Sequence, residues 1–272
     1  MLRMLAAVPI VQPIALAQAQ VQTVSLADVA TAVSVAVAGK MPSGLEADLV
    51  ETTPQDLRDV IVAIRHWMGF RPARWTLNLP DFTTAVIGRM ANAVSRLGWR
   101  SPLRTTAIKV LEDGITATPT NLVEFGVPQP SSLSQTLSNI PIGAQDRLFA
   151  RMSLLMPVVI VTLVLFWFSA GVIGLLRVNA AALTLEIVGW PHALAAFSVV
   201  IWAIVDIAIA AAFAVRKYAA LACWAAVIVS GFYLFASTVF VPHLWADPLG
   251  PLTKVIPGMV LALVARVGLE AR

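Results

Sequence analysis

The sequence has few charged residues and little of the cysteine and histidine chemistry that metalloenzymes use. Only 12% of its 272 residues are charged, about half of the roughly 25% usual in soluble domains; 58% are hydrophobic and the mean hydropathy is +0.82. The single Cys223 excludes an internal disulfide, a CxxC pair and a multi-thiolate zinc site. The three histidines, His66, His192 and His243, lack metal-ligand spacing. The composition therefore excludes a disordered or collagenous chain, predicts no metal centre and favours a membrane protein.

Nucleotide-binding turns are also missing. Neither GxGxxG nor GxxxxGK[ST] occurs, so no glycine-rich turn brings backbone N–H groups close to a pyrophosphate. Neither Tyr218 nor Tyr233 is followed four residues later by the lysine that tunes a tyrosine for proton transfer beside a nicotinamide. We therefore expect this chain alone to bind no nucleotide cofactor. Whether the protein is an enzyme stays open.

Charge divides the chain into two halves. Residues 1–146 hold 11 basic and 11 acidic side chains, whereas 147–272 hold eight and four. Met152 to Leu176 is uncharged over 25 residues, more than the roughly 20 that a spanning helix needs. Further spans are predicted at 192–214, 219–241 and 247–267, the last begun by Asp247 as N-cap and Pro248 at N1. This predicts a four-helix transmembrane bundle, in which Gly171, Gly174 and Gly231 permit close helix approach.

Loop charges predict the orientation of these spans. With the first half inside, six basic residues are cytoplasmic and only Arg177 and Lys254 lie outside, which follows the positive-inside rule. The six are Arg147, Arg151, Arg216, Lys217, Arg266 and Arg272. Both termini are therefore expected in the cytoplasm.

Residues 1–144 have the pattern of an incomplete α/β segment. Strands are predicted at 21–24 and 47–51, a buried helix over 28–37, and a loop over 71–80. Three helices are also predicted. The first is capped at Thr53 and has an apolar face made by Leu57, Val60, Ile61, Ile64 and Met68. The second is capped at Asp81 and has an apolar face made by Phe82, Val86, Met90, Val94 and Leu97, and the third begins at Ser101-Pro102. An incomplete sheet of this kind leaves an unpaired edge strand, which can form backbone hydrogen bonds with a strand of another chain.

The first 20 residues imitate a signal peptide, with Arg3, an apolar stretch and Ala17-Gln18-Ala19 resembling a cleavage site. Pro9 and Pro13 interrupt the apolar stretch, and export of this half would oppose the loop charges. We expect a segment inside a domain.

Asp206 is the most informative single residue because a carboxylate within a span costs a few kcal/mol unless it pairs, faces the bundle or holds a proton. Three interpretations stay open: an inward Asp bonded to a hydroxyl such as Ser230 or Thr162, a proton or quinone contact, and part of an ion or solute path.

Two other groups of charges invite interpretation. Glu186, Asp247 and Lys254 map toward the outer side, where they form either a polar cluster or separate solvated charges. A basic stretch relieved only by Asp81 is either a solvated face or a contact with anionic lipid, whereas nucleic-acid binding would need more charge and aromatic platforms. Its members are Arg71, Arg74, Arg89, Arg96, Arg100, Arg104 and Lys109.

Residues 145–272 resemble the DoxX-like membrane family, in the form fused to the C-terminus of bacterial short-chain dehydrogenase/reductase (SDR) proteins. The resemblance rests on 145–151 (QDRLFAR), Pro157, Phe166-Trp167, Asp206, 245–254 (WADPLGPLTK) and Pro257. Residues 1–144 are similar to the end of the attached SDR, through 21–30 (VQTVSLADVA), 71–74 (RPAR), 100–106 (RSPLRTT) and Gly126 ahead of Ser132-Leu133. The glycine-rich turn and the Tyr-Lys pair of that family are missing, so the resemblance implies an N-terminally truncated Rossmann domain and no cofactor-binding residue to carry over.

The DoxX resemblance implies quinone-linked or electron-transfer chemistry at the bacterial inner membrane. The expected function is a membrane component associated with an oxidoreductase, with a quinone as the candidate ligand and Asp206 as its contact. The alternatives are a non-enzymatic membrane anchor, or remnant of the fusion, and a small-solute transporter, for which no pair of broken helices is evident. Expected partners are the lipid bilayer, a soluble oxidoreductase subunit or a second copy, and no nucleic acid.

Overall fold

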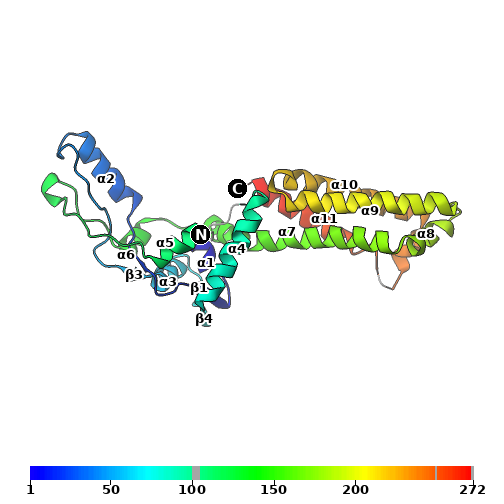
Figure 1. The fold of residues 1–272 in the computed structure, drawn as a ribbon, viewed down its shortest axis with the longest axis horizontal. Helices are drawn as coiled ribbons and strands as arrows, with labels where there is room; N and C mark the ends of the chain where they lie inside the picture. The colour runs from blue at the N-terminus through cyan, green and yellow to red at the C-terminus, as the bar shows by residue number, and fades with distance from the viewer. Residues whose placement is uncertain (100–104, 249, 271–272) are drawn as a thin grey trace. The chain divides into compact units, whose positions relative to one another are not determined.

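The computed structural model describes residues 1–99, 105–248 and 250–270, and these are mainly helical (Figure 1). They form two compact units. The N-terminal unit comprises Met1–Val94 and Arg100–Leu154; the membrane unit comprises Ser95–Trp99 and Leu155–Arg272.

The elements of the first half are short. In chain order they are α1 (Leu2–Ala6), β1 (Val11–Ala15), β2 (Gln20–Val21), α2 (Leu26–Val37), β3 (Gln55–Asp56), α3 (Leu57–Trp67), β4 (Trp75–Leu79), α4 (Asp81–Arg96), α5 (Thr105–Glu112), the 3-10 helix η1 (Val123–Phe125) and α6 (Leu133–Asn139). The second half consists of α7 (Ala144–Leu176), α8 (Val178–Glu186), α9 (His192–Ala214), α10 (Arg216–Phe240), the 3-10 helix η2 (Pro242–Ala246) and α11 (Val255–Glu270).

Two small sheets correct the predicted strands. β1 pairs with β4 in parallel, from Val11 opposite Trp75 to Ala15 opposite Leu79, so the predicted loop over 71–80 is wrong. β2 pairs with β3 antiparallel and takes only Val21 from the predicted strand 21–24. Residues 47–51 form no strand. Long-range pairing, which local patterns do not encode, decides these segments.

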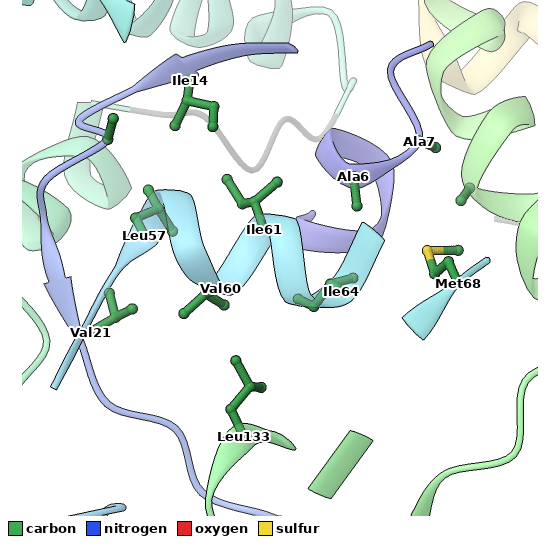
Figure 2. Packing of buried hydrophobic residues seen from close by; sticks show 12 residues of the cluster. Ala6, Ala7, Ile14, Val21, Leu57, Val60, Ile61, Ile64, Met68 and Leu133 are labelled. Atoms are coloured by element: carbon green, nitrogen blue, oxygen red, sulfur yellow. The ribbon is translucent and has the colours of Figure 1, made fainter. Parts of the chain in front are cut away.

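The core of the N-terminal unit confirms the predicted apolar face of α3. Leu57, Val60, Ile61, Ile64 and Met68 are all buried, and Figure 2 shows them gathered with Ala6, Ile14, Val21 and Leu133. The segment that imitates a signal peptide thus contributes to this core. The helix begins at Leu57 with Asp56 as N-cap, and not at Thr53 as predicted, because Gln55 and Asp56 pair with β2.

Two other helical faces do not pack as predicted. α2 follows its predicted range, with Ser25 as N-cap accepting a bond from the Asp28 amide, but it buries only Ala32, so the expectation of a buried helix is wrong. α4 has the predicted range as well, yet its apolar face is exposed and it buries small residues, Thr84, Gly88 and Ala91. A Cβ at Gly88 would lie 2.8 Å from Cγ2 of Thr105, so this narrow face accommodates α5.

Two buried charged side chains hold the loops of the N-terminal unit. Arg65 is 5% exposed and donates to the carbonyls of Ala6, Val8, Pro9 and Arg71 at 2.6–3.1 Å. Burial lowers the pKa of this guanidinium, but an arginine stays charged.

Glu51 is 3% exposed and has four donors. Its Oε1 accepts from the Thr23 amide and hydroxyl at 2.9 and 2.8 Å, and its Oε2 accepts from Gln55 and the Leu133 amide at 2.9 and 3.0 Å. One carboxylate therefore joins three segments of the chain.

Three helices in the second half are long and apolar enough to cross a membrane: α7, α9 and α10. The predicted fourth is α11, whose 16 residues give about 24 Å, less than the roughly 30 Å hydrocarbon layer. Its predicted start is wrong: Asp247 ends η2 in extended conformation and α11 begins at Val255.

Small residues set the helix spacing in the membrane unit. A Cβ at Gly171 would lie 2.6 Å from the Ala203 carbonyl oxygen, and one at Gly174 would lie 3.2 Å from Cβ of Ala203, so α7 and α9 meet there as predicted. Gly231 faces open space, and this part of the prediction is wrong. α11 packs against α7, with a Cβ at Gly268 reaching Met156 at 2.5 Å.

Some predictions lie outside the described residues. They concern Arg100 and Arg104 of the basic stretch, the helix start at Ser101-Pro102, Leu249 and Arg272.

Candidate functional site

The candidate site is a carboxylate–phenol pair between α9 and α10. Asp206 on α9 is 8% exposed, and its Oδ1 accepts a hydrogen bond of 3.0 Å from the Tyr233 hydroxyl on α10. The two helices pack against each other and are joined through Val215 alone, so they run antiparallel. Side chains lean toward the N-terminus of their own helix. Asp206 therefore leans away from the connection and Tyr233 toward it, which lets the two groups meet.

Aromatic rings adjoin this pair on one side. Trp202, one turn before Asp206, stacks on Phe232 with 4.9 Å between ring centroids and an interplanar angle of 24°. The same indole meets Tyr233 edge to face at 5.3 Å and 72°. Such contacts fix ring orientations, so the phenol that bonds Asp206 is itself held in place.

The pair lines a cavity of about 360 Å³ within the membrane unit, a volume within the range of small-molecule sites. Aromatic and small side chains make most of its wall, and Asp206, Tyr233, Ser198 and Ser237 supply the polar groups. Asp206 is the lining residue of α9 farthest along the helix from Trp190, which lines the cavity just before α9 begins. A largely apolar cavity with few polar groups favours a mainly apolar ligand that makes a small number of hydrogen bonds.

The bonded hydroxyl predicted for Asp206 is present, but it belongs to Tyr233 and not to Ser230 or Thr162. Tyr233 lacks the lysine of a nicotinamide site, and the sequence pattern assigned it no other role. The signal that could have found it is that Asp206 and Tyr233 are polar residues in consecutive spans joined by a very short connection, which forces their helices side by side.

The other predicted site residues are placed separately. Glu186, at the end of α8, bonds His192 with 2.6 Å between Oε1 and Nδ1. In the part of the chain that the structure describes, no ion pair joins Glu186 to Lys254. The three-residue polar cluster stays a prediction.

The described residues also lack a ligand set that could hold a metal ion. Among residues 1–99, 105–248 and 250–270, no group of three or more His, Cys, Asp or Glu side chains could hold a metal ion. Cys223 is buried on α10.

Part of the chain is similar to a known protein family. No curated protein and no solved structure matches the chain. The model of the DoxX-like family matches residues 164–263, a region that contains both Asp206 and Tyr233. With three apolar helices of spanning length, this match indicates a membrane protein, and the candidate pair lies within its DoxX-like region.

Proposed function

We propose that the protein is a membrane component of redox chemistry whose cavity receives the head group of a quinone. The observation that carries the proposal is the Asp206–Tyr233 pair on the wall of an aromatic-lined cavity. A quinone ring is flat and apolar, and its carbonyl oxygens accept hydrogen bonds. The Tyr233 hydroxyl has one hydrogen, which it donates to Asp206 in this structure. When a quinone binds, this hydroxyl can turn to a ring oxygen, and a protonated Asp206 can donate to the ring from its carboxyl group.

We expect a partner protein to supply the electrons for quinone reduction. A soluble oxidoreductase that delivers two electrons, together with two protons from water, would convert the quinone to the quinol. The chain's own part in this step is to bind the ring, orient it against Trp202 and Phe232, and place Asp206 beside a ring oxygen.

The test is binding of a short-chain ubiquinone or menaquinone analogue to the full chain in lipid nanodiscs. The quenching of tryptophan fluorescence measures the affinity. Tyr233→Phe removes one hydrogen bond and is expected to weaken binding about tenfold, which corresponds to about 1.4 kcal/mol. Asp206→Asn is expected to weaken it as well. Tyr218→Phe is the matched control, because Tyr218 is exposed near the start of α10. Equal affinity in all four proteins would overturn the proposal.

A second candidate is a non-enzymatic membrane anchor. It is favoured by the division of the chain into two compact units, of which the membrane unit holds α9, α10 and the part of α7 from Leu155 on. This function predicts that a soluble oxidoreductase co-purifies with the full chain and is lost when residues 1–144 are removed. Purification from the native membrane without such a partner would count against it.

We further propose a bacterial inner-membrane location with both termini in the cytoplasm and α11 as the fourth span. The loop charges support the orientation, and a helix of 16 residues can cross where the bilayer thins or flanking residues snorkel. Reporter fusions at the two termini test this: the same side supports four spans, and opposite sides support three.

A further inference from the structure

The apolar face of α4 is exposed in the part of the chain that the structure describes. Phe82, Val86, Met90, Val94 and Leu97 are between 42% and 71% exposed. At about 100° per residue these five positions lie within about 120° of one another. They form one continuous stripe, with Leu97 directly after the helix end.

Basic residues flank this stripe on one side. Arg89 and Arg96 are both exposed and lie on the helix surface between the stripe and the buried face. α4 has no acidic residue after Asp81 at its start. An apolar stripe flanked by arginines is the pattern of a helix lying in a membrane interface, where the guanidinium groups meet lipid phosphates and the apolar side chains enter the acyl boundary.

The chain just after α4 belongs to the membrane unit, and its residues bond the connection between α9 and α10. The Leu97 carbonyl accepts from the Arg216 amide at 2.9 Å, and the Trp99 indole donates to the Ala214 carbonyl at 2.7 Å. The Arg216 guanidinium lies over the Trp99 ring at 5.6 Å and also donates to the Leu269 carbonyl at 3.1 Å. Ala214 and Arg216 end α9 and begin α10, two helices of spanning length. This connection therefore lies at a membrane surface, as the interfacial tryptophan and arginine also suggest.

From these observations we propose that α4 lies in the headgroup region of the bilayer that α9 and α10 cross, with its stripe toward the lipid. The chain connection supports this: Leu97, whose carbonyl bonds the start of α10, directly follows Arg96, the last residue of α4. α2 provides the contrast: it also exposes apolar residues, such as Val33 at 56%, but it has no Lys or Arg. The occupant of the α4 stripe is thus anionic lipid of the same membrane and not a second protein.

Site-directed spin labelling of the full chain in nanodiscs tests this. Single cysteines are placed at Val86 and Met90 in a Cys223→Ala background, with Val33 on α2 and Lys109 on α5 as controls. Lipid contact raises collisions of the label with oxygen and lowers collisions with a water-soluble nickel complex. At positions 86 and 90 the oxygen-to-nickel ratio is expected to be several-fold higher than at the controls, and higher in phosphatidylglycerol than in neutral phosphatidylcholine.

Each other result would overturn the proposal. Nickel collisions at 86 and 90 equal to those at Val33 would mean that the stripe is in water. Low collisions with both reagents would mean that protein covers it. A label at Val94 should lose its lipid signature when Val86 and Met90 are both replaced by Glu, and an unchanged signature would show that the stripe does not hold the helix.

Discussion

Two buried carboxylates, one in each unit, have very different surroundings. Glu51 in the N-terminal unit has four hydrogen-bond donors from three residues, whereas Asp206 in the membrane unit has one, the Tyr233 hydroxyl, and lines a cavity. A carboxylate saturated by donors stabilises a fold, since its removal leaves those donors unpaired. One with a single neutral partner beside an open volume keeps a carboxyl oxygen that can bond a ligand, as an acceptor when ionised or as a donor when protonated. From this comparison we propose a structural role for Glu51 and a binding role for Asp206.

The largest expected effect is on Glu51. Glu51→Ala leaves the buried amides of Thr23 and Leu133 without their acceptor, and it should lower the free energy of unfolding of the N-terminal unit by about 4 kcal/mol. Hydrogen exchange of the Thr23 and Leu133 amides in the full chain measures this loss directly. Glu46→Ala, at an exposed position, is the control; equal protection in both variants would remove the structural role.

Arg65 is expected to rank second. Arg65→Met keeps the length of the side chain but loses the donors to four carbonyls, which should cost about 2–3 kcal/mol in unfolding free energy. Thermal unfolding in detergent, with Arg58→Met as the exposed control, checks it. A midpoint no lower than that of the control would contradict the account.

Helix spacing in the membrane unit gives a third prediction. Gly171→Ala places a Cβ 2.6 Å from the Ala203 carbonyl oxygen, so α7 and α9 must separate at a cost of about 1–3 kcal/mol. Gly231→Ala faces open space and should cost nothing measurable. Resistance to denaturation by SDS ranks the two variants, and an equal loss in both would refute this packing.

The sequence predicted those parts that depend on local periodicity. The α3 core face and the three long apolar helices follow from residue spacing and hydrophobic length alone. β4 was missed because its partner β1 lies some 60 residues earlier in the chain. Asp206 stood out as a lone charge in a span, but its partner depended on how two helices face each other, and the exposure of the α4 stripe depended on which face α5 covers.

The smallest expected effect concerns pH and the N-terminal unit. Burial acts to raise the pKa of Asp28, but bonds from Ser131 and Ser25 outweigh it and bring the pKa below 3.8. A lowered folded-state pKa means that the stabilisation is present above 3.8 and is lost as pH falls through the folded value. Exchange at the Ser131 amide, which donates to Asp28 at 2.9 Å, should therefore rise at strongly acidic pH relative to other amides. In Asp28→Asn this extra pH dependence should vanish.

The most direct test of the central claim is photo-crosslinking of an azido-quinone to the full chain in nanodiscs, with the labelled residues identified by mass spectrometry. The account predicts labelling of α9 and α10 residues that line the cavity, competed by unmodified quinone and reduced in both Asp206→Asn and Tyr233→Phe but not in Tyr218→Phe. Labelling confined to the lipid-facing surface, unchanged by competition or by either substitution, would contradict it.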